Sequence, residues 1–392
     1  MGQIDLSSED REWLEGVYQK LLVKMKAECE RIGTKIPYSP KDGKYSDMAE
    51  AYPGGISFWT NGFWPGMLWQ MYSATGDETY KNTAEGVEDR LSETLDTFEN
   101  LDHDIGFLFL PSAVANYRKT GNKEARRRGL HAANILAGRF NPVGKFIRAW
   151  NGSIGPVLGE NESSGGMIID CMMNIPILYW AAEETGDPRF YHIAVSHAKT
   201  AQQYIVREDG SSNHIVVFDP QTGEFLDNPG GQGFEQGSSW SRGQSWAVYG
   251  FSLTYRHTKD ESFLNTAKRC AHYSISNLAV NDWLPLVDYR APKAPLKYDS
   301  TAGMITACGL LELAEHVGEY EKNLYIRAAL NILKACDAKF SNWNPEIDSI
   351  VDGGTFFYHD PEGKNTEVPI IYADYYFIEA VLRLKGQDLF IW

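Results

Sequence analysis

Glu184-Thr185-Gly186-Asp187 separates two runs of apolar residues at helical spacing, and the same arrangement recurs along the chain. A glycine after the last turn of a helix takes the left-handed conformation that ends it, and the Asp that follows can cap the next helix. Each such turn therefore predicts a helix hairpin. Related turns occupy residues 74–77, 119–122 and 257–260, and a looser version occupies residues 316–319.

The starts of the first helices indicate how these hairpins are arranged. Trp59, Asp104, Asp170 and Arg242 each lie 16 or 17 residues before the third position of a turn. About 17 residues at ~1.5 Å per residue span roughly 25 Å, the length of a helix that crosses a domain. Unusual residues that are remote in sequence would therefore share one face of the fold.

Two further helices complete the pattern. An amphipathic stretch over residues 10–32 and a helix over residues 372–384 would form a sixth hairpin. Twelve helices in six hairpins predict an all-α closed ring, an (α/α)6 barrel, with the first helix of each hairpin in the inner ring. Because no low-complexity linker or composition break interrupts the chain, residues 1–392 are expected to form a single domain.

Composition restricts the classes of function. The chain has 392 residues and a net charge of −15, which argues against nucleic acid and anionic membrane surfaces as partners. Residues 1–10 are polar, and no apolar run approaches the roughly 18 residues of a membrane span. No pair of His or Cys residues has metal-ligand spacing, so no metal site is expected. We expect a cytoplasmic protein with reduced thiols, present as a monomer or weak oligomer.

Two carboxylates are candidates for catalysis. Asp170 interrupts the apolar run at residues 166–174, where burial disfavours a charge and raises its pKa toward the range of a general acid. Asp104 begins the preceding inner helix at nearly the same distance from its turn. Helix capping is the structural alternative for both, and a buried ion pair is another for Asp170. A ring of helices would bring Asp104 and Asp170 onto one rim. Enzymes that act on sugars commonly use such a pair of carboxylates.

Five tryptophans fall before or at the expected starts of inner helices. Aromatic faces stack on the apolar faces of pyranose rings, while polar neighbours bind the hydroxyls. Core packing is the alternative for any one of them, but a cluster on one rim favours a sugar site. The five are Trp59, Trp64, Trp150, Trp240 and Trp246.

Arg242 and His214 are the candidates for recognising charge. Arg242 stands between Trp240 and Trp246 at a helix start. There its guanidinium could bind a carboxylate through two parallel hydrogen bonds, and the flanking rings would exclude water from the pair. A salt bridge to a neighbouring loop is the structural alternative for Arg242. His214 lies on an apparent short strand outside the helical repeat, and a lone His there can be structural or functional.

Together, these motifs resemble a known family. Segments of this chain are similar to those of the unsaturated glucuronyl hydrolases, family 88 of the glycoside hydrolases, and the resemblance covers essentially the whole sequence. It implies an (α/α)6 barrel that removes the unsaturated uronic acid left by polysaccharide lyases at the non-reducing end of oligosaccharides. The specific segments are residues 166–174 and Trp240-Ser241-Arg242-Gly243-Gln244-Ser245-Trp246, and weaker ones are residues 103–107, 232–233 and 373–376.

The resemblance also implies roles for single residues. Asp170 would donate a proton to C4 of the vinyl ether and take one from the water that attacks C5. Asp104, with His103 beside it, would hold the sugar hydroxyls and favour the developing positive charge. The resulting hemiketal opens by itself, so the linkage breaks and no cofactor is implied. The other implied residues would surround the uronate: Trp59, Trp150, His214, Gln232, Trp240, Arg242 and Trp246.

Two other functions remain open. The related unsaturated rhamnogalacturonyl hydrolases carry out the same chemistry on pectin fragments, although residues 240–246 favour the glucuronyl branch. A non-catalytic oligosaccharide-binding protein would also use the aromatic residues and Arg242. Such a protein would have no need of a carboxylate in an apolar run.

One loop departs from the family members that favour sulfated glycosaminoglycan fragments, which carry Ser residues and a Lys there. Within residues 358–364 the Lys is kept as Lys364, but His359 and Glu362 stand at the Ser positions. Glu362 would repel a sulfate. A strict requirement for a sulfated substrate is therefore not expected.

Overall fold

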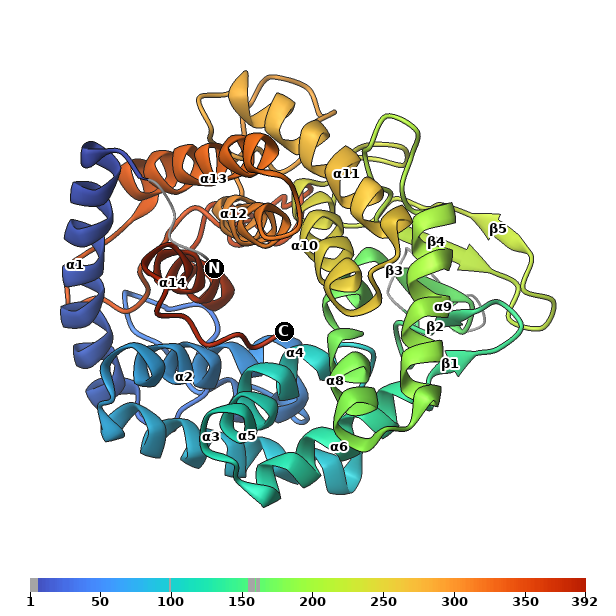
Figure 1. Cartoon of the computed structure of the whole chain (residues 1–392), viewed down its shortest axis with the longest axis horizontal. Coiled ribbons are helices and arrows are strands. Elements are labelled where there is room, and N and C mark those ends of the chain that lie inside the picture. The colour runs from blue at the N-terminus through green and yellow to red at the C-terminus, as the bar shows by residue number, and fades with distance from the viewer. Residues whose placement is uncertain (1–5, 99, 154–158, 160–162) are drawn as a thin grey trace.

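The computed structural model of the protein describes residues 6–98, 100–153, 159 and 163–392. Within these residues an inner ring of helices surrounds a central axis, and an outer ring covers it (Figure 1). The inner ring consists of α2 (Phe63–Thr75), α4 (Ile105–Phe109) with α5 (Ala115–Thr120), α8 (Pro176–Thr185), α10 (Ser241–Thr258), α12 (Ser300–Ala314) and α14 (Ile371–Lys385). The outer ring consists of α1 (Ser8–Ile32), α3 (Glu78–Thr97), α6 (Lys123–Ala137), α9 (Pro188–Tyr204), α11 (Glu261–Ala279) and α13 (Glu319–Phe340).

Helix pairing follows the predicted order. Inner helices α2, α8, α10 and α12 each pack against the outer helix that follows them in the chain. The last inner helix, α14, contacts both α1 and α2, so the ends of the chain close the ring. The predicted (α/α)6 barrel is confirmed, including the sixth hairpin made by α14 and α1.

The Thr-Gly-Asp turns have the predicted conformation. Gly186 has a φ of 71°, and its equivalents in the turns at 74–77 and 119–122 have φ of 72° and 74°. The Asp187 carboxylate accepts a hydrogen bond from the Arg189 N–H at 3.0 Å and caps α9. The Thr185 hydroxyl accepts the Asp187 N–H at 3.2 Å, which explains why a Thr precedes the glycine.

The looser turn at 316–319 differs from the others. Gly318 has a φ of −67° and a ψ of 163°, so it is the extended residue before α13 and not a left-handed residue after α12. Helix α12 ends at Ala314 with Glu315 as its C-cap. The hairpin therefore forms without the glycine signal.

The two rings differ in burial, as their positions require. Every residue of α12 is buried, whereas α3 buries one face that includes Tyr80, Val87 and Leu91. The inner helix over residues 105–120 contains a π turn at Leu110–Val114, where Pro111 supplies no backbone N–H. In the described part of the chain, no helix is long and apolar enough to cross a membrane.

A small antiparallel sheet lies outside the helical repeat. It consists of β3 (Gly166–Ile168), β4 (Ile215–Phe218) and β5 (Phe225–Asp227), with β4 in the middle. A separate hairpin pairs β1 (Phe140–Asn141) with β2 (Phe146–Ile147). Residues 166–174, expected at the start of an inner helix, instead form β3 and a 3₁₀ turn before α8. Pairing with β4 overrides the helical expectation for this segment.

Aromatic rings fill part of the ring axis. The C-terminal residue Trp392 is buried inside the ring, where Figure 1 marks the C-terminus, and stacks on Tyr376 of α14 at a centroid distance of 5.9 Å. Its indole N–H donates to the Glu379 carboxylate at 2.8 Å. Phe107 lies edge-on to the same ring at 6.0 Å. The interior of the ring at this level is therefore solid.

Candidate active site

A cavity of about 490 Å³ lies at the end of the ring where the inner helices begin. Its walls come from residues that precede or begin α2, α4, α8, α10 and α14. The predicted site residues that line it are Trp59, Asp104, Trp150, Asp170, His214, Gln232 and Arg242. The other three, His103, Trp240 and Trp246, are buried behind the wall.

Strand pairing brings Asp170 and His214 together. In the register of β3 and β4, Ile168 lies opposite Ile215. The contact extends by one residue, because the Ile169 N–H donates to the His214 carbonyl at 3.2 Å. Asp170 follows directly, and His214 Nε2 lies 3.6 Å from its Oδ2. A non-local strand contact thus positions the candidate acid, and His214 lies just before β4 instead of within it.

Contacts on the side of the ring away from Asp170 fix the orientation of His214. Its Nδ1 accepts a hydrogen bond from the Gln232 N–H at 3.2 Å, so the proton of the neutral ring lies on Nε2, which faces Asp170. Burial lowers the pKa of His214 to about 3 and keeps the ring neutral. Trp240 packs against the ring at a centroid distance of 4.3 Å. Gly231 approaches so closely that a Cβ there would lie 2.0 Å from Nδ1.

Asp170 has the properties of a proton carrier. Burial raises its pKa to about 6, while the positive charge of Arg242 and the nearby Trp246 indole lower it. No hydrogen bond from the described residues reaches Asp170 Oδ2, which is buried. A carboxyl group with this pKa can both give and take a proton near neutral pH, as general acid–base catalysis requires.

Asp104 is held by an amide that the sequence did not single out. Asn174, the last residue of the apolar segment 166–174, donates from Nδ2 to Asp104 Oδ1 at 2.9 Å. Its orientation is settled because its Oδ1 accepts the Phe107 N–H at 2.8 Å. Burial and the negative charges of Asp102 and Asp170 raise the pKa of Asp104 well above its ordinary value.

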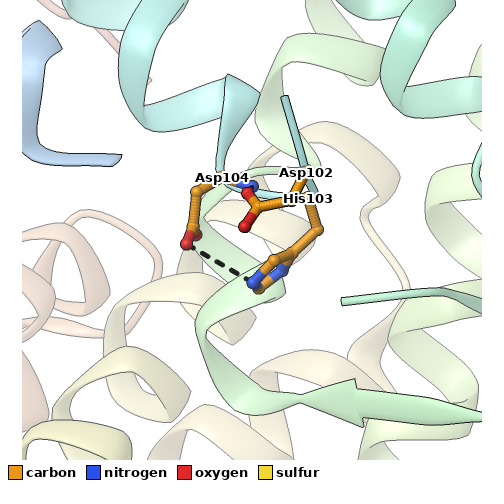
Figure 2. Close-up of side chains that lie close together, drawn as sticks. All are labelled: Asp102, His103 and Asp104. Carbon is orange, nitrogen blue, oxygen red and sulfur yellow. Dashed lines mark hydrogen bonds and ion pairs between the residues drawn. The ribbon is translucent and has the colours of Figure 1, made fainter. Parts of the chain in front are cut away.

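Asp102 and His103 complete the turn before α4. Figure 2 shows their side chains beside that of Asp104, with His103 Nε2 3.5 Å from Asp104 Oδ2. Asp102 lines the cavity, whereas His103 is fully buried and its pKa is well below the ordinary value because of that burial. The three residues offer donor atoms within 4.8 Å of one another. Asp104 Oδ1 and Asp102 Oδ1 already accept hydrogen bonds from Asn174 Nδ2 and the Asp104 N–H, so we assign the cluster to hydrogen bonding and proton chemistry.

Arg242 combines the two roles considered for it. Its guanidinium is 2% exposed and forms a salt bridge with Asp299 at 2.6 Å, so the structural alternative is realised. It also donates to the Thr355 and Phe356 carbonyls at 2.7 and 2.8 Å. These bonds use three of the five N–H groups. Among the described residues the Nε–H has no acceptor, and the side chain lines the cavity.

The rings around Arg242 differ from those expected. Trp240 packs on the guanidinium at 4.5 Å, and Tyr372 takes the other position at 5.6 Å. Trp246 lies one turn further along α10 and contacts Phe107 inside the ring at 5.2 Å. Trp64 is a core residue whose indole donates to the Gly33 carbonyl at 3.0 Å.

Gln232 connects two loops that form the cavity wall. Its side-chain amide donates to the Phe356 carbonyl at 2.6 Å. Its own carbonyl accepts the Tyr358 N–H at 2.7 Å, while its N–H orients His214. The loop around residue 232 is thereby fixed to the loop over 354–368.

The sequence did not indicate several aromatic residues of the wall. They come from irregular loops or helix starts that carry no periodic signal. Trp59 contacts Tyr372 at 5.0 Å, and Tyr38 stacks on Phe356 at 5.2 Å. The cavity residues that the sequence analysis missed include Tyr38, Phe58, Asp102, Phe356, Phe357 and Tyr372.

The 358–364 loop presents no unpaired cation to the cavity in the described part of the chain. Lys364 pairs with Glu362 at 2.7 Å, and both are exposed to solvent. His359 bonds through Nε2 to the Phe234 carbonyl at 2.6 Å. None of these residues lines the cavity.

Comparison with known proteins identifies the family. Residues 29–278 match the family described as Glycosyl Hydrolase Family 88. An unsaturated glucuronyl hydrolase from Bacillus sp. (strain GL1) is 40% identical over 332 residues, which are 83% of this chain and 86% of that protein. The chain belongs to glycoside hydrolase family 88. It is therefore a glycoside hydrolase of the unsaturated glucuronyl hydrolase family.

Solved and curated relatives extend this family 88 assignment. The crystal structure of the unsaturated glucuronyl hydrolase from Bacillus sp. GL1 has a TM-score of 0.86 and 34% identity, covering 95% of this chain and 97% of that one. An unsaturated chondroitin disaccharide hydrolase from Streptococcus pneumoniae is 37% identical over 85% of this chain and 83% of its own length. An aspartate-to-asparagine variant of the Streptococcus agalactiae enzyme, complexed with dGlcA-GalNAc6S, has a TM-score of 0.80 and 29% identity over 97% of this chain and 93% of that one.

Proposed function

We propose that the protein removes the Δ4,5-unsaturated uronic acid from the non-reducing end of lyase-generated glycosaminoglycan oligosaccharides by hydrating the C4=C5 double bond. The observation that carries this proposal is Asp170, a buried carboxyl group with a pKa of about 6 in a cavity shared with Asp104. The similarity to an unsaturated glucuronyl hydrolase and to an unsaturated chondroitin disaccharide hydrolase supports the substrate class.

The reaction needs one group that both gives and takes a proton. Protonated Asp170 donates to C4, and the positive charge that develops at C5 is attacked by water. The water gives its proton to Asp170, which restores the starting state. The product is a hemiketal at C5. Its ring opening yields a C5 ketone and leaves the aglycone on a hemiacetal carbon, from which it departs without a covalent enzyme intermediate.

The neighbours of Asp170 divide the remaining tasks. The Nε2–H of His214 faces the Asp170 carboxylate at 3.6 Å, and its dipole would stabilise the charged form after proton transfer. The unused Nε–H of Arg242 and its positive charge favour binding of the uronate carboxylate. Trp59 and Trp150 supply apolar faces for the sugar ring, and Asp104 binds its hydroxyls.

The aglycone is proposed to be unsulfated. Lys364 is neutralised by Glu362, so the loop that faces the aglycone in sulfate-preferring members carries no net positive charge here. Unsulfated unsaturated chondroitin and hyaluronan disaccharides are expected to be better substrates than their sulfated counterparts. Equal or higher kcat/KM for the sulfated forms would contradict this part of the proposal.

The decisive assay follows loss of ultraviolet absorbance of the conjugated enol ether. Unsaturated chondroitin, hyaluronan and heparin disaccharides are compared with unsaturated rhamnogalacturonan disaccharides. Turnover of the pectin fragment alone would indicate an unsaturated rhamnogalacturonyl hydrolase. Binding without turnover would indicate a non-catalytic carbohydrate-binding protein. In oxygen-18 water the label should appear at C5 of the uronate product, because hydration places solvent oxygen there. Label at C1 would indicate ordinary glycosidic displacement.

We further propose that residues 1–392 act as one domain, present as a monomer or weak oligomer in the cytoplasm. The five buried cysteines are all unpaired, which suits a reducing compartment. Neither nucleic acid nor a membrane is proposed as a partner, because the net charge is −15. Sedimentation analysis and a single calorimetric unfolding transition would test the assembly state and the domain count.

A further inference from the structure

Asp102 has no role in the mechanism above, yet it lines the cavity beside Asp104. Its Oδ1 accepts a hydrogen bond from the Asp104 N–H at 2.9 Å, which fixes the backbone from which the Asp104 side chain projects. The turn is anchored in addition by the His103 N–H, which donates to the Ala149 carbonyl at 3.2 Å. Figure 2 shows the side chains of the turn together at the start of α4. Asp102 thus contacts Asp104 directly, through a hydrogen bond to its backbone.

The Asp104 carboxyl has one engaged oxygen and one available oxygen. Oδ1 accepts from Asn174 Nδ2 at 2.9 Å, and the amide cannot be reversed because its Oδ1 is bonded to the Phe107 N–H. A proton on Asp104 therefore lies on Oδ2. That oxygen is 3.5 Å from His103 Nε2 and belongs to a side chain that lines the cavity.

We propose that Asp102 is a positioning residue that keeps Asp104 neutral, so that Asp104 Oδ2–H donates a hydrogen bond to a hydroxyl group of the substrate. The identity of that substrate rests on the proposed function. The protonation state of Asp104, in contrast, is a property of the free protein. Asp102 acts here through its charge and through the hydrogen bond to the Asp104 backbone.

The charges around the turn decide which carboxyl holds the proton. Burial raises the pKa of Asp104 well above its ordinary value, and the negative charges of Asp102 and Asp170 raise it further, while the hydrogen bond from Asn174 and the charge of Arg139 oppose them. Burial also raises the pKa of Asp102, but the Asp104 N–H and Arg139 both favour its charged form. Asp102 therefore keeps the negative charge and Asp104 keeps the proton.

The other titratable groups near Asp104 add no charge. Burial keeps the pKa of His103 well below its ordinary value and that of the Cys171 thiol well above it, so both are neutral. An ionised Asp104 would therefore place a further negative charge next to Asp170 and against an anionic uronate. Neutral Asp104 avoids this repulsion and gains a donor for the sugar hydroxyl.

The first experiment measures the titration of Asp104 without any ligand. In protein labelled with carbon-13 at the Asp carboxyl groups, the Asp104 resonance is the one that disappears in Asp104→Asn. Asp102→Asn removes the charge but keeps an oxygen that can accept the Asp104 N–H. We expect it to lower the midpoint of the Asp104 titration by about one pH unit or more, the usual effect of a contacting like charge. An unchanged midpoint would overturn the proposal.

Matched variants separate charge from structure. Asp102→Ser can also accept the Asp104 N–H and should lower the midpoint in the same way, which provides a second test if Asp102→Asn does not fold. Asp102→Glu keeps the charge and should retain the wild-type midpoint. Asp219→Asn is the control, because Asp219 accepts the Gln221 and Thr222 N–H groups of another turn and does not line the cavity.

Binding distinguishes this inference from the proposed function. In an Asp170→Asn background, turnover stops and the Kd of unsaturated chondroitin disaccharide can be followed against pH. Affinity should fall as pH rises through the Asp104 titration, and the fall should move to lower pH when Asp102→Asn is added. Weaker binding at every pH with an unmoved midpoint would make Asp102 merely structural and refute the inference. Absence of binding at any pH would refute the proposed substrate, while the carbon-13 titration still decides the state of Asp104.

Discussion

Replacing Gly231 by Ala tests whether the position of His214 controls the reaction. A Cβ at residue 231 would lie 2.0 Å from His214 Nδ1, whereas ordinary contact begins at 3.4 Å, so the ring or the loop must move by roughly 1.4 Å. Gly231 does not have a left-handed φ, so Ala adds no backbone strain there and the clash is with the His214 ring. Because a misplacement of about 1 Å can lower a rate about 100-fold, we expect kcat to fall by that order.

The assay is steady-state loss of enol-ether absorbance, with melting temperatures measured in parallel. Gly230→Ala is the matched control, because it adds the same methyl group to the same loop. The nearest atom to a Cβ at residue 230 is Gln236 N at 3.2 Å, which requires an adjustment of only a few tenths of an ångström. This control should stay near wild-type activity. A Gly231→Ala enzyme with wild-type kcat, and a displaced His214 in its crystal structure, would refute the coupling between His214 and Asp170.

Three further substitutions follow from the same contacts. Asp170→Asn should reduce kcat below about a tenth of wild type, which is a barrier increase of at least ~1.4 kcal/mol. Kd should be preserved, because the amide keeps the shape of the side chain but cannot carry the proton. Measuring kcat together with the equilibrium Kd checks this. Burial raises the pKa of Glu28 to about 8 from 4.5, so the stability contributed by its neutral form is complete below pH 4.5 and is lost as pH rises through 8. Glu28→Gln should remove this loss of about 1.4 kcal/mol per pH unit, which urea unfolding at a series of pH values between the two pKa values measures; an unchanged slope would contradict it. Arg242→Ala should lower kcat/KM more than tenfold. It should also lower the melting temperature, because the buried Asp299 loses its partner at a cost of about 3–5 kcal/mol of folding free energy. An equal loss of kcat/KM with a methyl-esterified substrate would show that Arg242 has a structural role alone.

Most of the helix hairpins can be predicted from the sequence because their turns carry a local signal, although the hairpin of α12 and α13 forms without it. Thr185, Gly186 and Asp187 satisfy the ends of two helices within a few residues. The repeat then places Asp104 and Asp170 at the same end of the ring. Asp170 carries a second local signal, because it is a carboxylate in an apolar run, whereas Asp104 is found only from its distance to the turn.

The partners of these residues cannot be found in the same way. Arg242 pairs with Asp299, which lies 57 residues later, and no local pattern marks that contact. The pairing of β3 with β4, which brings His214 to Asp170, depends on registry between distant segments. Asn174 ends the segment 166–174 and Asp102 directly precedes the segment 103–107, but Asp and Asn are common at turns and helix starts for capping alone.

A ring of helices could be an open tube, and the stack of Trp392 and Tyr376 on its axis makes it a blind well instead. A polymer cannot thread through such a well, so only a chain terminus can reach the bottom. Under the proposed function, the relevant substrate concentration is the molar concentration of chain ends and not the mass of polysaccharide. Under the proposed function, each cut made by a lyase creates one new unsaturated end, and long intact chains are poor substrates until that cut is made.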